Sequence, residues 1–139
     1  MKATLFADGG SRGNPGPAAS GAVLYAEDGG LLEEVALGLG IATNNVAEWR
    51  ALVIGLEAAL RHGIDTIVVR MDSELVVKQM NGLYRVKHPD LVPLHREALR
   101  ARARFASFEI GHVRRAQNAA ADAVVNRVLD AAAAGRAAG

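Results

Sequence analysis

Hydrophobic positions recur along this chain with two different periods, and these periods predict where its strands and helices lie. Short alternating or continuous apolar runs predict five strands, over residues 3–7, 20–26, 31–39, 66–71 and 105–113. Apolar residues three or four positions apart predict helices over 45–62, 73–80, 91–104 and 118–134, the first ended by Gly63 and the third begun by Asp90. The predicted order of elements is βββαβααβα.

The connections between these elements predict how the strands pair. Short turns join the first three strands, which makes them antiparallel neighbours. The fourth strand follows a helix and is almost continuously apolar, as expected for a strand buried on both faces and parallel to the first. We therefore expect an α/β fold with a five-stranded mixed sheet, three strands antiparallel and then two parallel, flanked by helices. Residues 1–134 form one domain, and residues 135–139 a disordered tail or the start of a linker.

Composition narrows the class of protein. Half of the 139 residues are hydrophobic, enough for the core of one globular domain. No apolar run approaches the roughly 20 residues of a membrane-spanning helix, and no signal segment marks the N-terminus, so we expect a soluble, unprocessed chain. The absence of cysteine excludes disulfides, thiolate metal ligands and a cysteine nucleophile, and it is compatible with the cytoplasm, where we expect the protein.

The net charge of +1 conceals two halves of opposite sign. Residues 1–72 carry five Lys and Arg against nine Asp and Glu, a net charge of −4, whereas residues 73–139 carry eleven against six, a net charge of +5. A basic half favours a polyanionic partner, but an acidic half repels one unless cations intervene. Charge alone is therefore compatible with a nucleic acid partner but does not establish one.

Four acidic residues stand at positions that need an explanation. Asp8 and Asp72 each follow an apolar strand, where an unpaired carboxylate is costly unless it finds a cation. Asp122 lies inside a helix with no opposite charge three or four positions away. Ordinary structural roles can also explain three of the four acids: Asp8 starts a turn, Glu48 caps a helix together with Asn45, and Asp72 lies at a helix N-terminus.

The predicted sheet brings three of these acids together. Asp8 and Asp72 lie side by side at the carboxyl ends of parallel neighbours, and the helix that carries Glu48 begins over the same edge. Three carboxylates a few ångströms apart do not all stay ionised without a cation, and oxygen ligands alone suit Mg²⁺ or Mn²⁺ rather than zinc. Two such ions, roughly 3.5–4 Å apart, can hold a phosphate, activate water and stabilise the leaving oxygen.

Polar residues next to these acids suit a nucleic acid. Thr43, Asn44 and Asn45 offer short side-chain donors and backbone N–H groups at a helix start. The glycine-rich turn at 10–16 allows close approach of its backbone. That turn has neither the Gly-Lys-Ser/Thr ending of an ATP-binding loop nor a GxGxxG that opens a helix, so both of these nucleotide sites are disfavoured.

Four strings carry a resemblance to a known family: DGGSRGNPGP from Asp8, TNNVAEWRAL from Thr43, MDSELVV from Met71, and the series Gly111, His112, Asn118 and Asp122. From Thr4 to about Leu129, the chain resembles a type 1 ribonuclease H in the form without the basic handle insertion. The resemblance implies that two Mg²⁺ or Mn²⁺ ions are held, with substrate bound, by Asp8, Glu48, Asp72 and Asp122. It also implies hydrolysis of the RNA strand of an RNA/DNA hybrid by in-line water attack, leaving 5′-phosphate and 3′-hydroxyl ends.

The resemblance also assigns residues to binding and proton transfer. His112 matches a loop histidine that assists proton transfer or the release of product and metal. Recognition of the hybrid falls to four short polar side chains: Asn14, Thr43, Asn44 and Asn45. Trp49 fits core packing better than stacking on nucleic acid. Three further histidines match no functional position, and the last two are expected at the surface: His62, His88 and His95.

Three features depart from the family pattern. Glu74 stands where many members have a Gln that contacts the hybrid, and an ionised carboxylate cannot donate that hydrogen bond. The loop at 81–89 is short and carries few basic residues, so its grip on substrate would be weak and salt-sensitive. In the last loop, Arg114 stands where related sequences often have Pro, and Arg115 beside it is a candidate for phosphate contact.

Two alternatives to the hybrid-specific nuclease stay open at this point. A DNA-directed nuclease of the integrase-like superfamily would share the acid-bearing sheet, although the asparagine-rich segment argues against it. A non-catalytic hybrid-binding module is disfavoured because all four acids are present. We expect a monomer, and the alanine-rich C-terminal end is compatible with a fused C-terminal domain in a longer protein.

Overall fold

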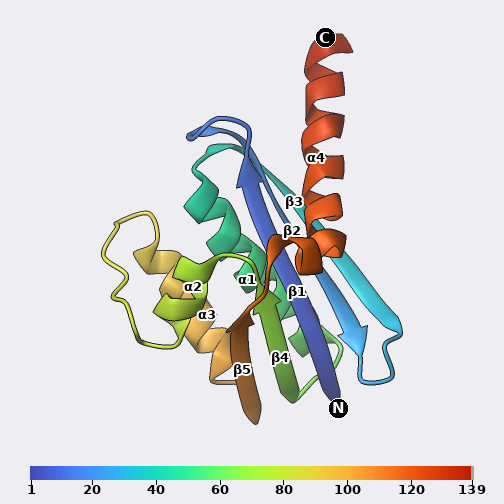
Figure 1. Cartoon of the computed structure of the whole chain (residues 1–139), viewed down its shortest axis with the longest axis vertical. Coiled ribbons are helices and arrows are strands. Elements are labelled where there is room, and N and C mark those ends of the chain that lie inside the picture. Colours follow the sequence, from blue (N-terminus) through green and yellow to red (C-terminus); the bar gives the residue numbers. More distant parts are fainter. Residues whose placement is uncertain (139) are drawn as a thin grey trace.

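The computed structural model describes residues 1–138 and contains one five-stranded mixed sheet (Figure 1). The strands are β1 (Lys2–Ser11), β2 (Gly16–Ala26), β3 (Leu31–Ala42), β4 (Thr66–Met71) and β5 (Ser107–His112). Their order across the sheet is β3-β2-β1-β4-β5. The pairs β1–β2 and β2–β3 are antiparallel, whereas β1–β4 and β4–β5 are parallel. The predicted fold class is therefore confirmed.

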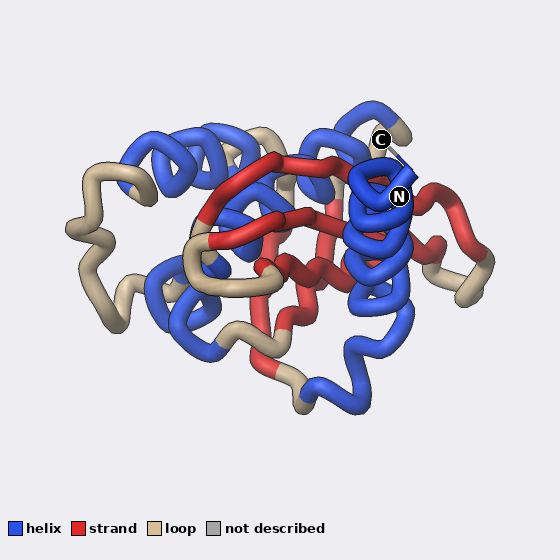
Figure 2. The backbone as a smooth tube through the Cα atoms, turned by 90° about the horizontal axis from the view of Figure 1, so that it is seen from above, coloured by secondary structure: helices blue, strands red, loops and turns tan. Residues whose placement is uncertain are grey.

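Helices cover both faces of this sheet. They are α1 (Asn44–Arg61), α2 (Glu74–Met80), α3 (Val92–Arg102) and α4 (Ala119–Ala138), with a 3₁₀ turn, η1 (Arg115–Asn118), before the last. In Figure 1, α4 lies in front of the strands and α1 behind them, and the view from above shows helices on more than one side of the strands (Figure 2). None of the helices in residues 1–138 combines the length and apolar character needed to cross a bilayer.

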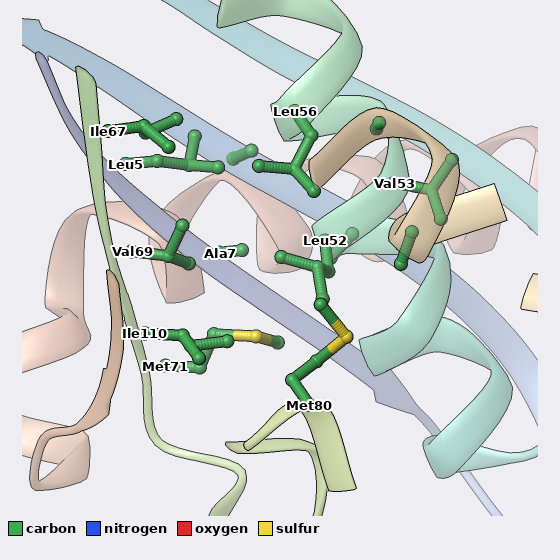
Figure 3. Close-up of a cluster of buried hydrophobic side chains, with 14 of the residues drawn as sticks. Leu5, Ala7, Leu52, Val53, Leu56, Ile67, Val69, Met71, Met80 and Ile110 are labelled. Atoms are coloured by element: carbon green, nitrogen blue, oxygen red, sulfur yellow. The ribbon is translucent and has the colours of Figure 1, made fainter. Parts of the chain in front are cut away.

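The main core lies between α1 and the sheet. Leu5 and Val69 of the central strands pack with Leu52 and Leu56 of α1, and none of the four is exposed to solvent (Figure 3). Because side chains alternate along a strand, Phe6 points to the opposite face, where it packs in the cluster beneath α4. The next residue of that second series on β1 is Asp8, so strand periodicity directs it toward the α4 side.

The hairpin of β1 and β2 is longer than the sequence predicts. The prediction ended the first strand at residue 7 and began the second at residue 20, because glycine normally marks a turn. In the structure, Gly9 and Gly10 still pair with Ser20 and Ala19 of β2. Gly9 serves close packing rather than the turn, and the paired part of the hairpin extends beyond Asp8.

Two helix caps differ from those expected. Thr43, not Asn45, caps α1, because its Oγ1 accepts the N–H of Val46 at 3.2 Å. This leaves Glu48 without a capping role. The helix predicted to begin after Asp90 begins at Val92 with no side-chain cap. The N–H of Asp90 donates instead to Nδ1 of His88 at 3.1 Å, which gives the preceding loop its own local hydrogen bond.

The last helix and one histidine also differ from expectation. The prediction ended the helix at about residue 134, but α4 continues to Ala138 because alanine is the best helix former. Residues 135–138 of the predicted tail are thus helical, and Gly139 lies outside the described residues. Trp49 is fully buried as predicted. His95, expected at the surface, is instead half-buried with its ring edge-on to Trp49, because α3 packs against α1.

Candidate active site

Two acids meet where the pairing of β1 with β4 ends. The parallel pairing of these strands ends with Ala7 opposite Met71, so the next residues, Asp8 and Asp72, emerge side by side. Glu48, in the second turn of α1, joins them: one oxygen from each of the three carboxylates lies within 4.8 Å of the others. The predicted juxtaposition is therefore present, and Asp8 and Glu48 are both buried.

Close packing of α1 on β1 brings Glu48 into this group. A Cβ atom at Gly9 would overlap the backbone of Ala47 and Glu48, so only glycine permits the observed approach. From β2, the hydroxyl of Ser20 donates a buried hydrogen bond of 2.6 Å to the carbonyl of Ala47. The first turns of α1 are therefore fixed against the sheet from two directions.

The fourth acid, Asp122, reaches the group from α4. Its carboxyl group lines the same cavity and lies close enough to that of Asp8 to raise the pKa of Asp8. Asn126, one turn further along α4, donates to Asp122 at 3.2 Å, and the guanidinium of Arg115 lies 3.7 Å from Asp122. The start of the helix is anchored by buried Asn118, whose side-chain amide donates to the carbonyl of Ala7 at 2.9 Å.

Burial and the neighbouring acids raise the pKa of two of these residues, Asp8 and Glu48. Burial, followed by repulsion from Asp72 and Asp122, raises the pKa of Asp8 from 3.8 to about 8. Burial also raises the pKa of Glu48 from 4.5 to about 7, with repulsion from Asp72 adding to it and hydrogen bonds from Ser73 and Asn44 opposing it. The nearby arginines therefore do not balance the negative charge of this group. Carboxylate oxygens in this number suit a divalent cation such as Mg²⁺ or Mn²⁺, so the residues present fit a hard metal.

The four acids open into a polar cavity of about 530 Å³. Its wall is formed by the end of β1, the start of α1 and one side of α4, and its lining includes the backbone of Gly9 and Gly10. Two cations also line it, Arg12 from the β1–β2 turn and Arg115 from η1. The cavity opens to solvent, so part of a polymer backbone can enter it.

The predicted hybrid-binding residues lie along the rim. Oδ1 of Asn14 accepts the N–H of Asn44 at 3.1 Å, so the β1–β2 turn is tied to the start of α1. Asn44 lines the acidic cavity, whereas Asn14, Thr43 and Asn45 line a smaller neighbouring pocket of about 200 Å³. His88, expected at the surface without a role, is exposed but also lines this smaller pocket.

The remaining predicted residues lie further out. His112 ends β5, opposite Met71 of β4, and is exposed. Glu74, at the start of α2, is also exposed, and Lys78 holds it at 2.9 Å and lowers its pKa, with a smaller contribution from His112. Glu74 is therefore a carboxylate with a cation beside it, which disfavours the direct hybrid contact that a Gln would make.

Sequence reasoning missed several residues of this site. Ser20, Arg12 and Asn126 were not singled out, yet the first holds α1 and the other two line the cavity. Only the spacing of Asn126, four residues after Asp122, could have placed it on the same helix face. The contacts of Ser20 and Arg12 join parts of the chain that no local pattern connects.

Comparisons with known proteins assign the family. The sequence pattern of the family described as reverse transcriptase-like matches residues 6–128. "Ribonuclease HI" of Halobacterium salinarum is 48% identical over 128 residues, covering 90% of this chain and 63% of the relative. "Bifunctional protein Rv2228c" of Mycobacterium tuberculosis is 48% identical over 134 residues, covering 96% of this chain. The chain spans only 37% of that relative's length.

Solved structures agree with this assignment. The N-terminal RNase H domain of Rv2228c from Mycobacterium tuberculosis, determined as a fusion with maltose binding protein, superposes with a TM-score of 0.94 at 46% identity, covering 98% of this chain and 99% of that chain. LC11-RNase H1 in complex with an RNA/DNA hybrid superposes with a TM-score of 0.87 at 40% identity, covering 94% and 98%. The chain therefore belongs to the reverse transcriptase-like family and, within it, to the type 1 ribonucleases H.

Proposed function

We propose that this chain hydrolyses the RNA strand of RNA/DNA hybrids with the help of Mg²⁺ or Mn²⁺. The observation that carries the proposal is the convergence of four carboxylates from β1, α1, β4 and α4 on one cavity. Its setting in a type 1 ribonuclease H fold, and the hybrid bound to the related LC11-RNase H1, support this substrate. The reaction adds water at phosphorus as the P–O3′ bond breaks, which leaves 5′-phosphate and 3′-hydroxyl ends.

The acids of the cavity would hold the ions, two of them with substrate bound. When bound, these ions would activate the attacking water and stabilise charge on the phosphate and the leaving oxygen. Asp8 is central to the group, since its carboxyl interacts with those of Asp72, Asp122 and Glu48. Its raised pKa means that cation binding displaces a proton from the site at neutral pH.

Other residues of the chain would position the hybrid and move protons. The side chain of Asn44 contacts Glu48, and its backbone N–H is held by Asn14, so this segment connects the acids to the rim. The amides of Asn14 and Asn44 can read the 2′-hydroxyl, a donor and acceptor that DNA lacks. His112, exposed at the end of β5, would exchange a proton between the leaving group and solvent.

Cleavage of a labelled hybrid with Mg²⁺ tests this function. We expect wild type to cut the RNA strand, and both Asp8→Asn and Asp72→Asn to lose nearly all activity, because each removes a metal ligand. Glu57→Gln, which removes an exposed carboxylate of α1 outside the cavity, should match wild type. Undiminished cleavage in both site variants would disprove the proposal.

One further substrate and a binding assay separate the alternatives, and a histidine variant tests proton transfer. Equal cleavage of duplex DNA would indicate a DNA-directed nuclease, and a gel shift without cleavage would indicate a binding module. His112→Ala should lower kcat while leaving KM nearly unchanged, as expected for a residue that acts on protons rather than on binding. Because this chain covers only 37% of the mycobacterial relative, we also propose that the whole protein carries a further C-terminal domain.

A further inference from the structure

An ion pair beside the cavity joins the β1–β2 turn to α4. Nη2 of Arg12, in the β1–β2 turn, lies 2.6 Å from Oδ1 of Asp130 on α4. The Arg12 side chain is 42% exposed and that of Asp130 is 70% exposed. The pair joins residues 118 positions apart in the chain. An arginine of the cavity lining is therefore neutralised by an acid that lies outside the lining.

The position of Asp130 continues a polar row along α4. Asp122, Asn126 and Asp130 are four residues apart, so they lie one above another on the helix. Asp122 and Asn126 line the cavity, and Asp130 holds Arg12 just beyond them. In Figure 1, α4 continues well past the end of the sheet on the side where β1 and β2 are joined. The row thus leads from the acids to the β1–β2 turn that carries Arg12.

The charge of the cavity gives Arg12 a second possible anion. Four carboxylates line the cavity, and within residues 1–138 its cationic lining consists of Arg12 and Arg115. A nucleic-acid backbone entering this space therefore needs the few cations present. Guanidinium matches a phosphate with two parallel hydrogen bonds, as it matches a carboxylate. Asp130 is the anion that occupies this position in the free protein.

The ion pair is easily exchanged. Ion pairs between exposed side chains are weak, because water and salt screen them and two long side chains must be held in place. A phosphodiester next to the acids is fixed by several contacts at once and competes effectively for Arg12. Both side chains are open to solvent, so exchange requires only rotation of the arginine side chain.

We propose that Arg12 is a substrate-binding residue that leaves Asp130 for a backbone phosphate of the hybrid, so that Asp130 acts as a competing internal anion. This inference rests on the proposed function, because it takes the hybrid as the ligand. It adds a phosphate contact on the β1–β2 turn and a residue, Asp130, that weakens binding. A purely structural pair would behave differently, because it would only hold the turn that carries Asn14 in place.

Opposite responses of the two partners test the exchange. Dissociation constants for a labelled hybrid are measured with Mg²⁺ on an Asp72→Asn background, so that bound substrate stays intact, and KM is measured on the active background. We expect Arg12→Gln to raise Kd about fivefold and to reduce the slope of log Kd against log salt by about 1, since one phosphate contact is lost. Asp130→Asn should lower Kd about two- to threefold, as expected for removing a weak competitor.

A second ion pair on the same helix supplies matched controls. Arg127 of α4 lies 2.8 Å from Glu34 of β3, and neither residue lines the cavity. Arg127→Gln removes one positive charge, as Arg12→Gln does. Glu34→Gln removes one negative charge, as Asp130→Asn does. Both controls should stay within about 1.5-fold of the parent in Kd, because their charges lie away from the bound backbone.

Any other pair of results would disprove the proposal that Arg12 leaves Asp130 for a phosphate. If both Arg12→Gln and Asp130→Asn weaken binding, the pair only positions the turn. If each site variant merely equals its charge-matched control, net charge alone explains the change. Where wild type cleaves the hybrid, these results overturn this inference and leave the proposed function intact. If wild type neither binds nor cleaves the hybrid, the proposed function fails and this inference fails with it.

Discussion

Replacing Asp8 with Asn should stabilise the metal-free protein while removing its activity. Asp8 is buried, its neighbours Asp72 and Asp122 are also acids, and its pKa is raised from 3.8 to about 8. The ionised form is therefore costly in the folded state. Asn has nearly the same shape as a protonated Asp and carries no charge, so the substitution removes this cost without leaving a cavity.

The size of the gain follows from the pKa. A rise from 3.8 to about 8 corresponds to an upper limit of about 6 kcal/mol, at ~1.4 kcal/mol for each pH unit. Asp8 faces an open cavity, where water screens part of the repulsion, and the other acids can take up protons in its place. We therefore expect about 2–3 kcal/mol in the free energy of unfolding at pH 8.

The raised pKa of Asp8 determines how the stability difference between wild type and variant changes with pH. Below about pH 4, Asp8 is protonated in both folded and unfolded chains, so the wild type then keeps its full stability and the variant has no advantage. Between pH 4 and 8 the unfolded chain loses the proton that the folded chain retains, and wild-type stability falls. The advantage of Asp8→Asn should grow across this window and level off above pH 8.

Urea unfolding in EDTA at several pH values measures the effect, with Glu57→Gln as a control for losing an exposed carboxylate. Adding Mg²⁺ should then make the wild type more stable than Asp8→Asn, because ligand binding to the folded wild type adds stability that the variant lacks. Equal stability of Asp8→Asn and wild type at pH 8 in EDTA would refute the reasoning, since it would mean that neither burial nor the neighbouring acids destabilise ionised Asp8.

Two packing predictions concern the elements that hold the site. Gly55→Ala should destabilise the protein by about 1–3 kcal/mol in urea unfolding, because its Cβ would lie 2.7 Å from a methyl group of Leu5. Gly135→Ala in the open part of α4 should be neutral or stabilising, and equal effects would contradict the packing argument. Asn118→Ala should cost about 1–3 kcal/mol by removing the buried bond to Ala7, and an unchanged unfolding midpoint would contradict this.

Local patterns in the sequence were sufficient for the architecture. The change between strand and helix periods predicts βββαβααβα, and the structure has this order. The position of Asp8 and Asp72 directly after two parallel strands also predicts that they meet. Element boundaries were less accurate where one residue had two roles. Gly9, for example, looks like a turn residue but lies inside β1, because α1 needs its missing side chain.

What the sequence by itself determined is the set of elements, their order and the identity of the acids, because periodicity and adjacency are local properties of the chain. Only the tertiary structure decided how closely these acids lie and which contacts hold them. The approach of α1 at Gly9, the bond from Asn118 to Ala7 and the pairing of Arg12 with Asp130 all join distant parts of the chain. Such contacts depend on how whole elements pack, and no local spacing encodes them.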